Sequence, residues 1–145
     1  MIRRATIQDV DAIMAIVRGA QQALAELGID QWQDGYPSRA VIETDIENGV
    51  GYVCCSVDNH PIGYSAFVFS GEDAYLQLSD DMWHTPNSYV VVHRLCVARE
   101  MRRSGIAHQL MCYAANMARN RGINAFRIDT HRGNIRMLQM MVKYD

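Results

Sequence analysis

The stretch Arg102-Arg103-Ser104-Gly105-Ile106-Ala107 joins a valine-rich segment, Ser88 to Val97, to a long segment in which apolar residues recur at helical spacing. The local order is therefore strand, short loop, helix. A loop of this kind directs several backbone N–H groups outward at the positive end of the helix dipole, and Gly105 lets a ligand approach the backbone closely. We expect the loop to bind a pyrophosphate. The alternative is an ordinary helix start with two solvated arginines.

Further strands surround this unit. Val50 to Val57 and Ile62 to Phe69 are strand-like, and the turn-rich sequence between them predicts an antiparallel hairpin. The long helix should run from Ile106 to about Arg121, and Ala125 to Thr130 should form a strand parallel to Ser88–Val97 through a right-handed crossover. The pattern predicts an α/β fold with a mixed sheet, in which antiparallel hairpins come first and strand–helix–strand–helix follows.

The first half of the chain carries helix start and stop signals. Thr6 and Asp9 form a variant of the capping box ahead of an apolar-periodic segment, and Gly28 is a plausible cap at the end of that segment. Ser38 is placed to cap a short second helix that ends near Asn48.

Composition limits the function. A chain of 145 residues with 49% apolar residues suggests one domain with a real core, and a net charge of −2 gives no general attraction to nucleic acid or anionic membranes. The sequence contains no membrane-spanning apolar run and no signal-peptide pattern, so we expect a cytoplasmic protein. The cysteines and histidines lack metal-ligand spacing, so we expect buried thiols, no disulfide framework and no metal.

The string R-x-x-G-x-A after a strand ending Leu95-Cys96-Val97 resembles motif A of the GNAT superfamily of acetyl-CoA-dependent N-acetyltransferases. The resemblance covers most of the chain. Residues 1–6 and the helix after them are similar to the family's first strand and helix. Residues 127–129, followed by Asn134, are similar to its fifth strand and final helix. The resemblance implies a single acetyltransferase-like domain over residues 1–145, with acetyl transfer from acetyl-CoA to a primary amine by direct attack in a ternary complex.

The resemblance also implies which residues bind the acyl donor. Backbone groups of the strand would bind the pantetheine arm, and the Val97 N–H would donate to the thioester oxygen, where negative charge grows. Cys96 as a ping-pong nucleophile is an alternative, but a small buried hydrophobe accounts for it better. The implied donor-binding residues are Leu95, Cys96, Val97, Arg102, Arg103, Ser104, Gly105, Ile106, Ala107 and Asn134.

An attacking amine must first lose its proton, so a base is needed. Asp129, on the expected fifth strand, is the first candidate, and His93 and His131 are the others. Asp129 could instead cap its strand or form a salt bridge with Arg94 or Arg127, and His93 could be an ordinary half-buried histidine.

The general acid departs from the family pattern. The family usually has a tyrosine seven residues after the asparagine of its last helix, where this chain has Met141. Tyr144, one helical turn further on, could replace it. The thiolate could also leave unassisted, because a thiol with a pKa of roughly 8.5 is a good leaving group. The acceptor pocket should be lined by loop residues that could equally be half-buried anchors, namely Trp32, Gln33, Tyr36 and Trp83.

The sequence stops near the point where the family continues with two more strands, so we expect a domain truncated at its C-terminus that lacks them. Ala125–Thr130 would then be a sheet edge, which a homodimer could cover. The expected partner is a small-molecule or peptide amine, with no nucleic acid and no membrane. The alternative function is a non-catalytic acyl-CoA-binding or assembly module. Nucleotide binding is a weaker reading, because the sequence has no Walker lysine and no G-x-G-x-x-G.

Overall fold

The computed structural model describes residues 1–29, 32, 34–70, 89–122 and 126–128. Within these ranges the strands form one sheet in the order β1-β2-β3-β4-β5. The strands are β1 (Ile2–Arg4), β2 (Gly51–Cys55), β3 (Pro61–Ser70), β4 (Tyr89–Val97) and β5 (Phe126–Ile128). The helices are η1 (Ile7–Asp9), α1 (Val10–Glu26), α2 (Arg39–Glu47), η3 (Arg99–Met101) and α4 (Ile106–Asn120).

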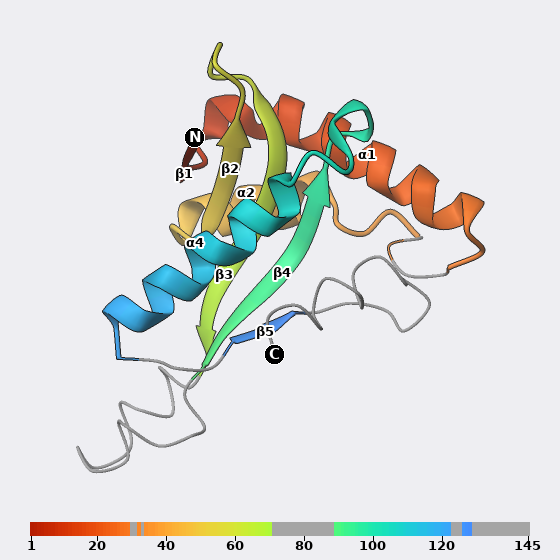
Figure 1. The fold of residues 1–145 in the computed structure, drawn as a ribbon. Coiled ribbons are helices and arrows are strands. Elements are labelled where there is room, and N and C mark those ends of the chain that lie inside the picture. Colours follow the sequence, from red (N-terminus) through yellow and green to blue (C-terminus); the bar gives the residue numbers. More distant parts are fainter. Residues whose placement is uncertain (30–31, 33, 71–88, 123–125, 129–145) are drawn as a thin grey trace.

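The sheet is mixed, as the sequence predicts. Strands β1 to β4 pair antiparallel with their neighbours, and β5 pairs parallel to β4 over Val90–Val92. Helix α4 makes the crossover between β4 and β5. It lies across one face of the sheet, while α1 and α2 lie against the other (Figure 1). The predicted α/β fold class is thus confirmed. The predicted last helix and the predicted absence of further strands lie outside the described residues.

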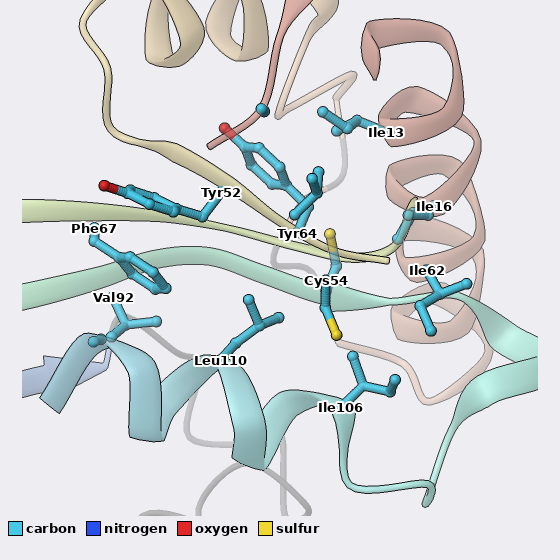
Figure 2. Packing of buried hydrophobic residues seen from close by; sticks show 14 of the residues in the cluster. Ile13, Ile16, Tyr52, Cys54, Ile62, Tyr64, Phe67, Val92, Ile106 and Leu110 are labelled. Carbon is cyan, nitrogen blue, oxygen red and sulfur yellow. The ribbon is translucent and has the colours of Figure 1, made fainter. Parts of the chain in front are cut away.

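The core lies on both sides of the sheet. Ile13 and Ile16 reach the sheet from α1, and Ile106 and Leu110 reach it from α4 on the opposite side (Figure 2). Every residue of β2 is buried, because helices cover both of its faces. Among the helices that the structure describes, none has both the length and the apolar character that a bilayer crossing requires.

The predicted helix signals are present. The Thr6 N–H donates to Asp9 Oδ2 at 2.7 Å, which anchors the turn that leads into α1. Gly28 follows that helix with a φ of +73°, the left-handed conformation of a C-terminal cap. The Ser38 hydroxyl accepts from the Val41 N–H at 3.3 Å and caps α2.

A glycine sets the position of α4 on the sheet. A Cβ atom at Gly63 would lie 2.6 Å from Ile106 Cγ2 and 3.3 Å from Leu110 Cδ1. No side chain fits in that space, so the first turns of α4 pack directly on the β3 backbone. Gly63 therefore determines where the start of α4, and the loop before it, stand relative to β4.

Strand β4 contains a bulge. Tyr64 pairs with Cys96 and Ala66 pairs with His93, so two residues of β4 lie opposite the single residue Ser65. Arg94, within the bulge, has a φ of +56°, which is uncommon for a residue other than glycine. The Ser65 hydroxyl donates to the His93 carbonyl at 2.9 Å and stabilises the bulge from β3.

Candidate active site

The loop before α4 has the backbone geometry of an anion site. Arg103 and Gly105 have φ values of +65° and +86°. The first helical hydrogen bond of α4 runs from the Gln109 N–H to the Gly105 carbonyl at 3.0 Å. The N–H groups of Gly105, Ile106 and Ala107 precede that bond, at the positive end of the helix dipole. These groups can bind an anion without any rearrangement of the helix.

The side chains of the loop leave room for a ligand. A Cβ at Gly105 would meet no atom within 4 Å, so the space over this residue is open. Arg102 is half-buried and Arg103 is exposed, and they add two positive charges to the segment just before Gly105. The Ser104 hydroxyl donates to the Met101 carbonyl and holds the loop closed on η3. This arrangement fits a pyrophosphate better than an uncharged ligand.

The backbone of β4 beside this loop presents a donor. The Ala98 N–H donates to the Ile62 carbonyl at 2.8 Å, and Val97 lies opposite Gly63. In an antiparallel ladder this makes Val97 and Gly63 a non-hydrogen-bonded pair. The Val97 N–H therefore points away from β3, towards the side of β4 on which β5 lies. The pairing described between β4 and β5 covers Val90–Val92, at the opposite end of β4.

Cys96 lies in the core. It is 5% exposed, and burial raises the pKa of its thiol to about 12. A thiol with this pKa is protonated at neutral pH, so it lacks the thiolate that a nucleophilic cysteine needs. The described cysteines are all free, with Cys54 and Cys55 buried and Cys112 half-buried rather than buried as expected.

The predicted acceptor and base residues are only partly described. His93 is half-buried on β4 next to the bulge. Trp32 is half-buried and packs against the core, as a loop anchor does, whereas Tyr36 is 42% exposed. The remaining predicted site residues lie outside the described part of the chain, namely Gln33, Trp83, Asp129, His131, Asn134 and Tyr144.

The structure also contains a polar cluster that the sequence did not reveal. Arg94 Nε and Nη2 donate to the two carboxylate oxygens of Asp45, at 2.8 and 2.5 Å. The Tyr64 hydroxyl donates to Asp45 Oδ2 at 2.6 Å, and Arg94 Nη1 donates to the Tyr36 hydroxyl oxygen at 2.8 Å. These contacts join α2, β3, β4 and the loop between α1 and α2. We call these residues, Tyr36, Asp45, Tyr64 and Arg94, the Asp45–Arg94 cluster.

The ion pair within the cluster is largely buried, whereas Tyr36 is exposed. The side chains of Arg94 and Asp45 are 14% and 7% exposed. Burial lowers the pKa of Arg94, but the hydrogen bonds to Asp45 and Tyr36 outweigh that effect, so the net pKa is raised. Burial and the hydrogen bond to Asp45 raise the pKa of Tyr64. The guanidinium is therefore always charged, and the phenol of Tyr64 keeps its proton.

A sequence signal for this cluster exists. Asp45 falls on the apolar face of its helix with Val41, Ile42 and Ile46, where an acid needs a buried partner. The sequence suggested Arg94 only as a partner for Asp129, yet the structure shows it bound to Asp45. Within the described ranges, no group of histidine, cysteine and acidic side chains gathers to hold a metal ion.

Comparison with known proteins identifies the family. The model of the acetyltransferase (GNAT) family matches residues 18–144. A GNAT-family acetyltransferase structure from Streptococcus agalactiae is 30% identical over 99% of this chain and 82% of its own, with a TM-score of 0.79.

Two further structures share the fold at lower identity. A GNAT-family acetyltransferase from Listeria monocytogenes is 22% identical over 99% of this chain and 84% of its own, with a TM-score of 0.73. The PaiA N-acetyltransferase from Thermoplasma acidophilum, in complex with coenzyme A, is 18% identical over 99% of this chain and 87% of its own, with a TM-score of 0.73. No curated protein matches the sequence. Because the family model spans most of the chain, the chain belongs to the GNAT acetyltransferase family.

Proposed function

We propose that the chain is an N-acetyltransferase that moves an acetyl group from acetyl-CoA to a primary amine. The observation that carries the proposal is the start of α4, where the N–H groups of Gly105, Ile106 and Ala107 lie in a loop with open space over Gly105. The Val97 N–H, which points away from β3, is the second donor in the proposal. Family membership supports acyl transfer, and the coenzyme A bound to the Thermoplasma acidophilum protein supports an acyl-CoA donor.

In the proposed reaction, the start of α4 and the arginines beside it bind the pyrophosphate, and the backbone of Leu95–Val97 binds the pantetheine arm. The Val97 N–H donates to the thioester oxygen as negative charge grows there. The amine nitrogen bonds to the carbonyl carbon while the carbon–sulfur bond breaks. The thiolate then takes a proton from Tyr144 or from water. Burial of Cys96 in its protonated form supports direct attack over a ping-pong route.

The base in this proposal is Asp129 or His93. If Asp129 accepts the amine proton, Asp129→Asn should lower turnover more at low pH than at high pH, because free amine is scarcest there. The same pH profile of His93→Gln assigns the base between the two. Trp32, Gln33, Tyr36 and Trp83 are the proposed acceptor-binding residues.

Replacement of Gly105 by glutamate tests the central assignment. Gly105→Glu places a negatively charged side chain where the pyrophosphate is proposed to bind, and we expect acetyl-CoA binding to fall below detection by calorimetry. Gly122→Glu is the matched control. Gly122 also has a positive φ, and a Cβ there would likewise meet no atom within 4 Å, but this residue lies beyond the other end of α4. Gly122→Glu should bind acetyl-CoA like the parent. Equal binding by Gly105→Glu and the parent would overturn the assignment.

A non-catalytic acyl-CoA-binding module is the second candidate, because Met141 stands where the family usually has its tyrosine. Turnover of acetyl-CoA with a mixed panel of amines distinguishes an enzyme from such a module. We also propose a homodimer, supported by the outer position of β5 in the described sheet. Light scattering over a concentration series tests that assembly.

A further inference from the structure

We propose that the Asp45–Arg94 ion pair positions the acceptor amine, by holding Tyr36 in place over the bulge of β4. The inference rests on the proposed acetyltransferase function. Asp45 and Arg94 are positioning residues in this proposal, and Tyr36 is the residue through which they act on the acceptor.

Tyr36 is attached to the rest of the fold at two points. The residue is 42% exposed, yet both its hydroxyl and its backbone carbonyl are hydrogen-bonded. Its hydroxyl oxygen accepts from Arg94 Nη1 at 2.8 Å, and its carbonyl accepts from Gln21 Nε2 at 2.8 Å. An exposed tyrosine without such contacts would lose little by rotating away. The two contacts tie this loop residue to β4 and to α1.

The Arg94 side chain, which holds the Tyr36 hydroxyl, is itself fixed. Arg94 could not hold a loop if its own side chain were mobile. Its guanidinium is fixed by two hydrogen bonds to Asp45, and Asp45 in turn accepts from the hydroxyl of Tyr64, a residue with 0% exposure. A planar guanidinium bound in this bidentate way has one orientation, which leaves Nη1 directed at Tyr36.

The bulge lies close in sequence to the proposed reacting end of the donor. Arg94 is three positions before Val97, whose N–H is the proposed donor to the thioester oxygen, and it follows His93, a candidate base. Because Tyr36 is hydrogen-bonded to this part of β4, its position is fixed relative to the proposed reacting end of the donor. Loss of the hydrogen bond between Arg94 and Tyr36 should weaken binding of the amine and should leave the pyrophosphate loop before α4 unaffected.

The chain contains a matched control for this cluster. Arg3 also donates to both oxygens of a buried aspartate, Asp9, at 2.7 and 3.0 Å, and it too joins a strand to a helix. That pair lies on β1, at the opposite edge of the sheet from β5. Damage to the Arg3–Asp9 pair should therefore change stability without a selective effect on the amine.

The experiment compares steady-state kinetics of the parent with Tyr36→Phe, Arg94→Lys and Arg3→Lys, with the amine that the parent acetylates fastest. Tyr36→Phe removes one hydroxyl, and we expect the KM for the amine to rise at least about fivefold, the equivalent of one ordinary hydrogen bond. The KM for acetyl-CoA should stay at the parent value. Arg94→Lys should raise the KM for the amine at least as much. The double variant Tyr36→Phe/Arg94→Lys should have nearly the same amine KM as Arg94→Lys alone, because both changes remove the same contact.

The outcomes separate the two proposals. An unchanged amine KM in Tyr36→Phe, or an equal rise in Arg3→Lys, overturns the positioning role while the parent still turns over acetyl-CoA. A parent without turnover overturns the proposed function and this inference together. Tyr36→Phe removes only one hydroxyl from an exposed residue, so the test stands even if Arg94→Lys does not fold.

Discussion

Asp9 links the first strand to the first helix through a partly buried ion pair. Arg3 donates to both of its carboxylate oxygens, and the Thr6 N–H donates as well. The hydrogen bonds from Arg3 lower the pKa of Asp9 in the folded chain, despite the opposing effect of burial. The carboxylate therefore stabilises the folded state above the unfolded pKa of aspartate, about 3.9, and this stabilisation disappears as the pH falls through the lower folded pKa.

Asp9→Asn should therefore lower the free energy of unfolding by about 1 to 3 kcal/mol at pH 7, the range for hydrogen bonds to charged groups. The difference from the parent should shrink as the pH falls below about 4. Urea denaturation at several pH values measures it. Asp11→Asn is the control, because Asp11 pairs with Arg39 at the surface and is 87% exposed. Asp11→Asn should lower the free energy of unfolding by less than about 1 kcal/mol. A difference in the free energy of unfolding between Asp9→Asn and the parent that stays constant down to pH 2 would contradict the prediction.

Single residues were predictable from the sequence where their role depends on neighbours along the chain. Gly105 is an example, because the order of strand, loop and helix placed it at the start of the long helix, where the structure has it with a φ of +86°. The Asp45–Arg94 pair was not predictable in the same way. Its partners lie 49 positions apart, one on α2 and the other in the bulge of β4, and no local pattern along the chain links them.

At the scale of elements, the packing of α4 on β3 depends on one missing side chain. Gly63→Ala would place a Cβ 2.6 Å from Ile106 Cγ2, and a branched side chain in a helix has little freedom to rotate away. The start of α4 must then move. We expect a loss of about 1 to 3 kcal/mol in the free energy of unfolding, as for other overpacked cores. The acetyl-CoA affinity should fall as well, because the proposed pyrophosphate site moves with the helix.

Two further variants test whether the effect of Gly63→Ala comes from its contact with α4. Gly19→Ala lies inside α1, where the new Cβ meets only Arg99 Cγ at 3.8 Å, so it should stabilise the chain by about 0.5 to 1 kcal/mol. Ile106→Ala removes the clashing methyl, so adding it to Gly63→Ala should destabilise less than the sum of the single changes. Additive losses in a denaturation series, or a Gly63→Ala chain as stable as the parent, would show that the packing adjusts without strain.

Element boundaries were predictable to within a few residues because helix caps are local. Ser38 and Gly28 mark the start of α2 and the end of α1 as expected. The bulge in β4 is different in kind, because it arises from the mismatch between Tyr64–Cys96 and Ala66–His93 on two separate strands. Periodicity along one strand contains no information on that mismatch.

At the scale of the whole molecule, the order of elements was enough to predict the mixed sheet. The parallel pairing of β4 with β5 was predicted from the order strand, helix, strand, and the structure confirms it. This topology brings the end of β4 and the start of α4 side by side. The two halves of an acyl-CoA, its pantetheine arm and its pyrophosphate, would therefore contact two different elements of one fold.

That division predicts how ligands should change thermal stability. A ligand at 100 times its Kd stabilises a folded chain by about 2.7 kcal/mol, which raises Tm by about 5 to 10 °C for a domain of this size. Acetyl-CoA should give the full shift. ADP, which offers a pyrophosphate without a pantetheine arm, should bind the loop before α4 alone and give a smaller shift at the same concentration. Differential scanning fluorimetry measures both.

Two variants show whether the loop before α4 is responsible for the rise in Tm with each ligand. Gly105→Glu should abolish the response to both ligands, because the pyrophosphate is common to them, whereas Gly122→Glu should respond like the parent. Equal shifts with ADP and acetyl-CoA would mean that the loop binds a nucleotide and that β4 contributes nothing to the affinity. The backbone of Leu95–Val97 would then have no role in donor binding, and the proposed donor role of the Val97 N–H would have to be abandoned.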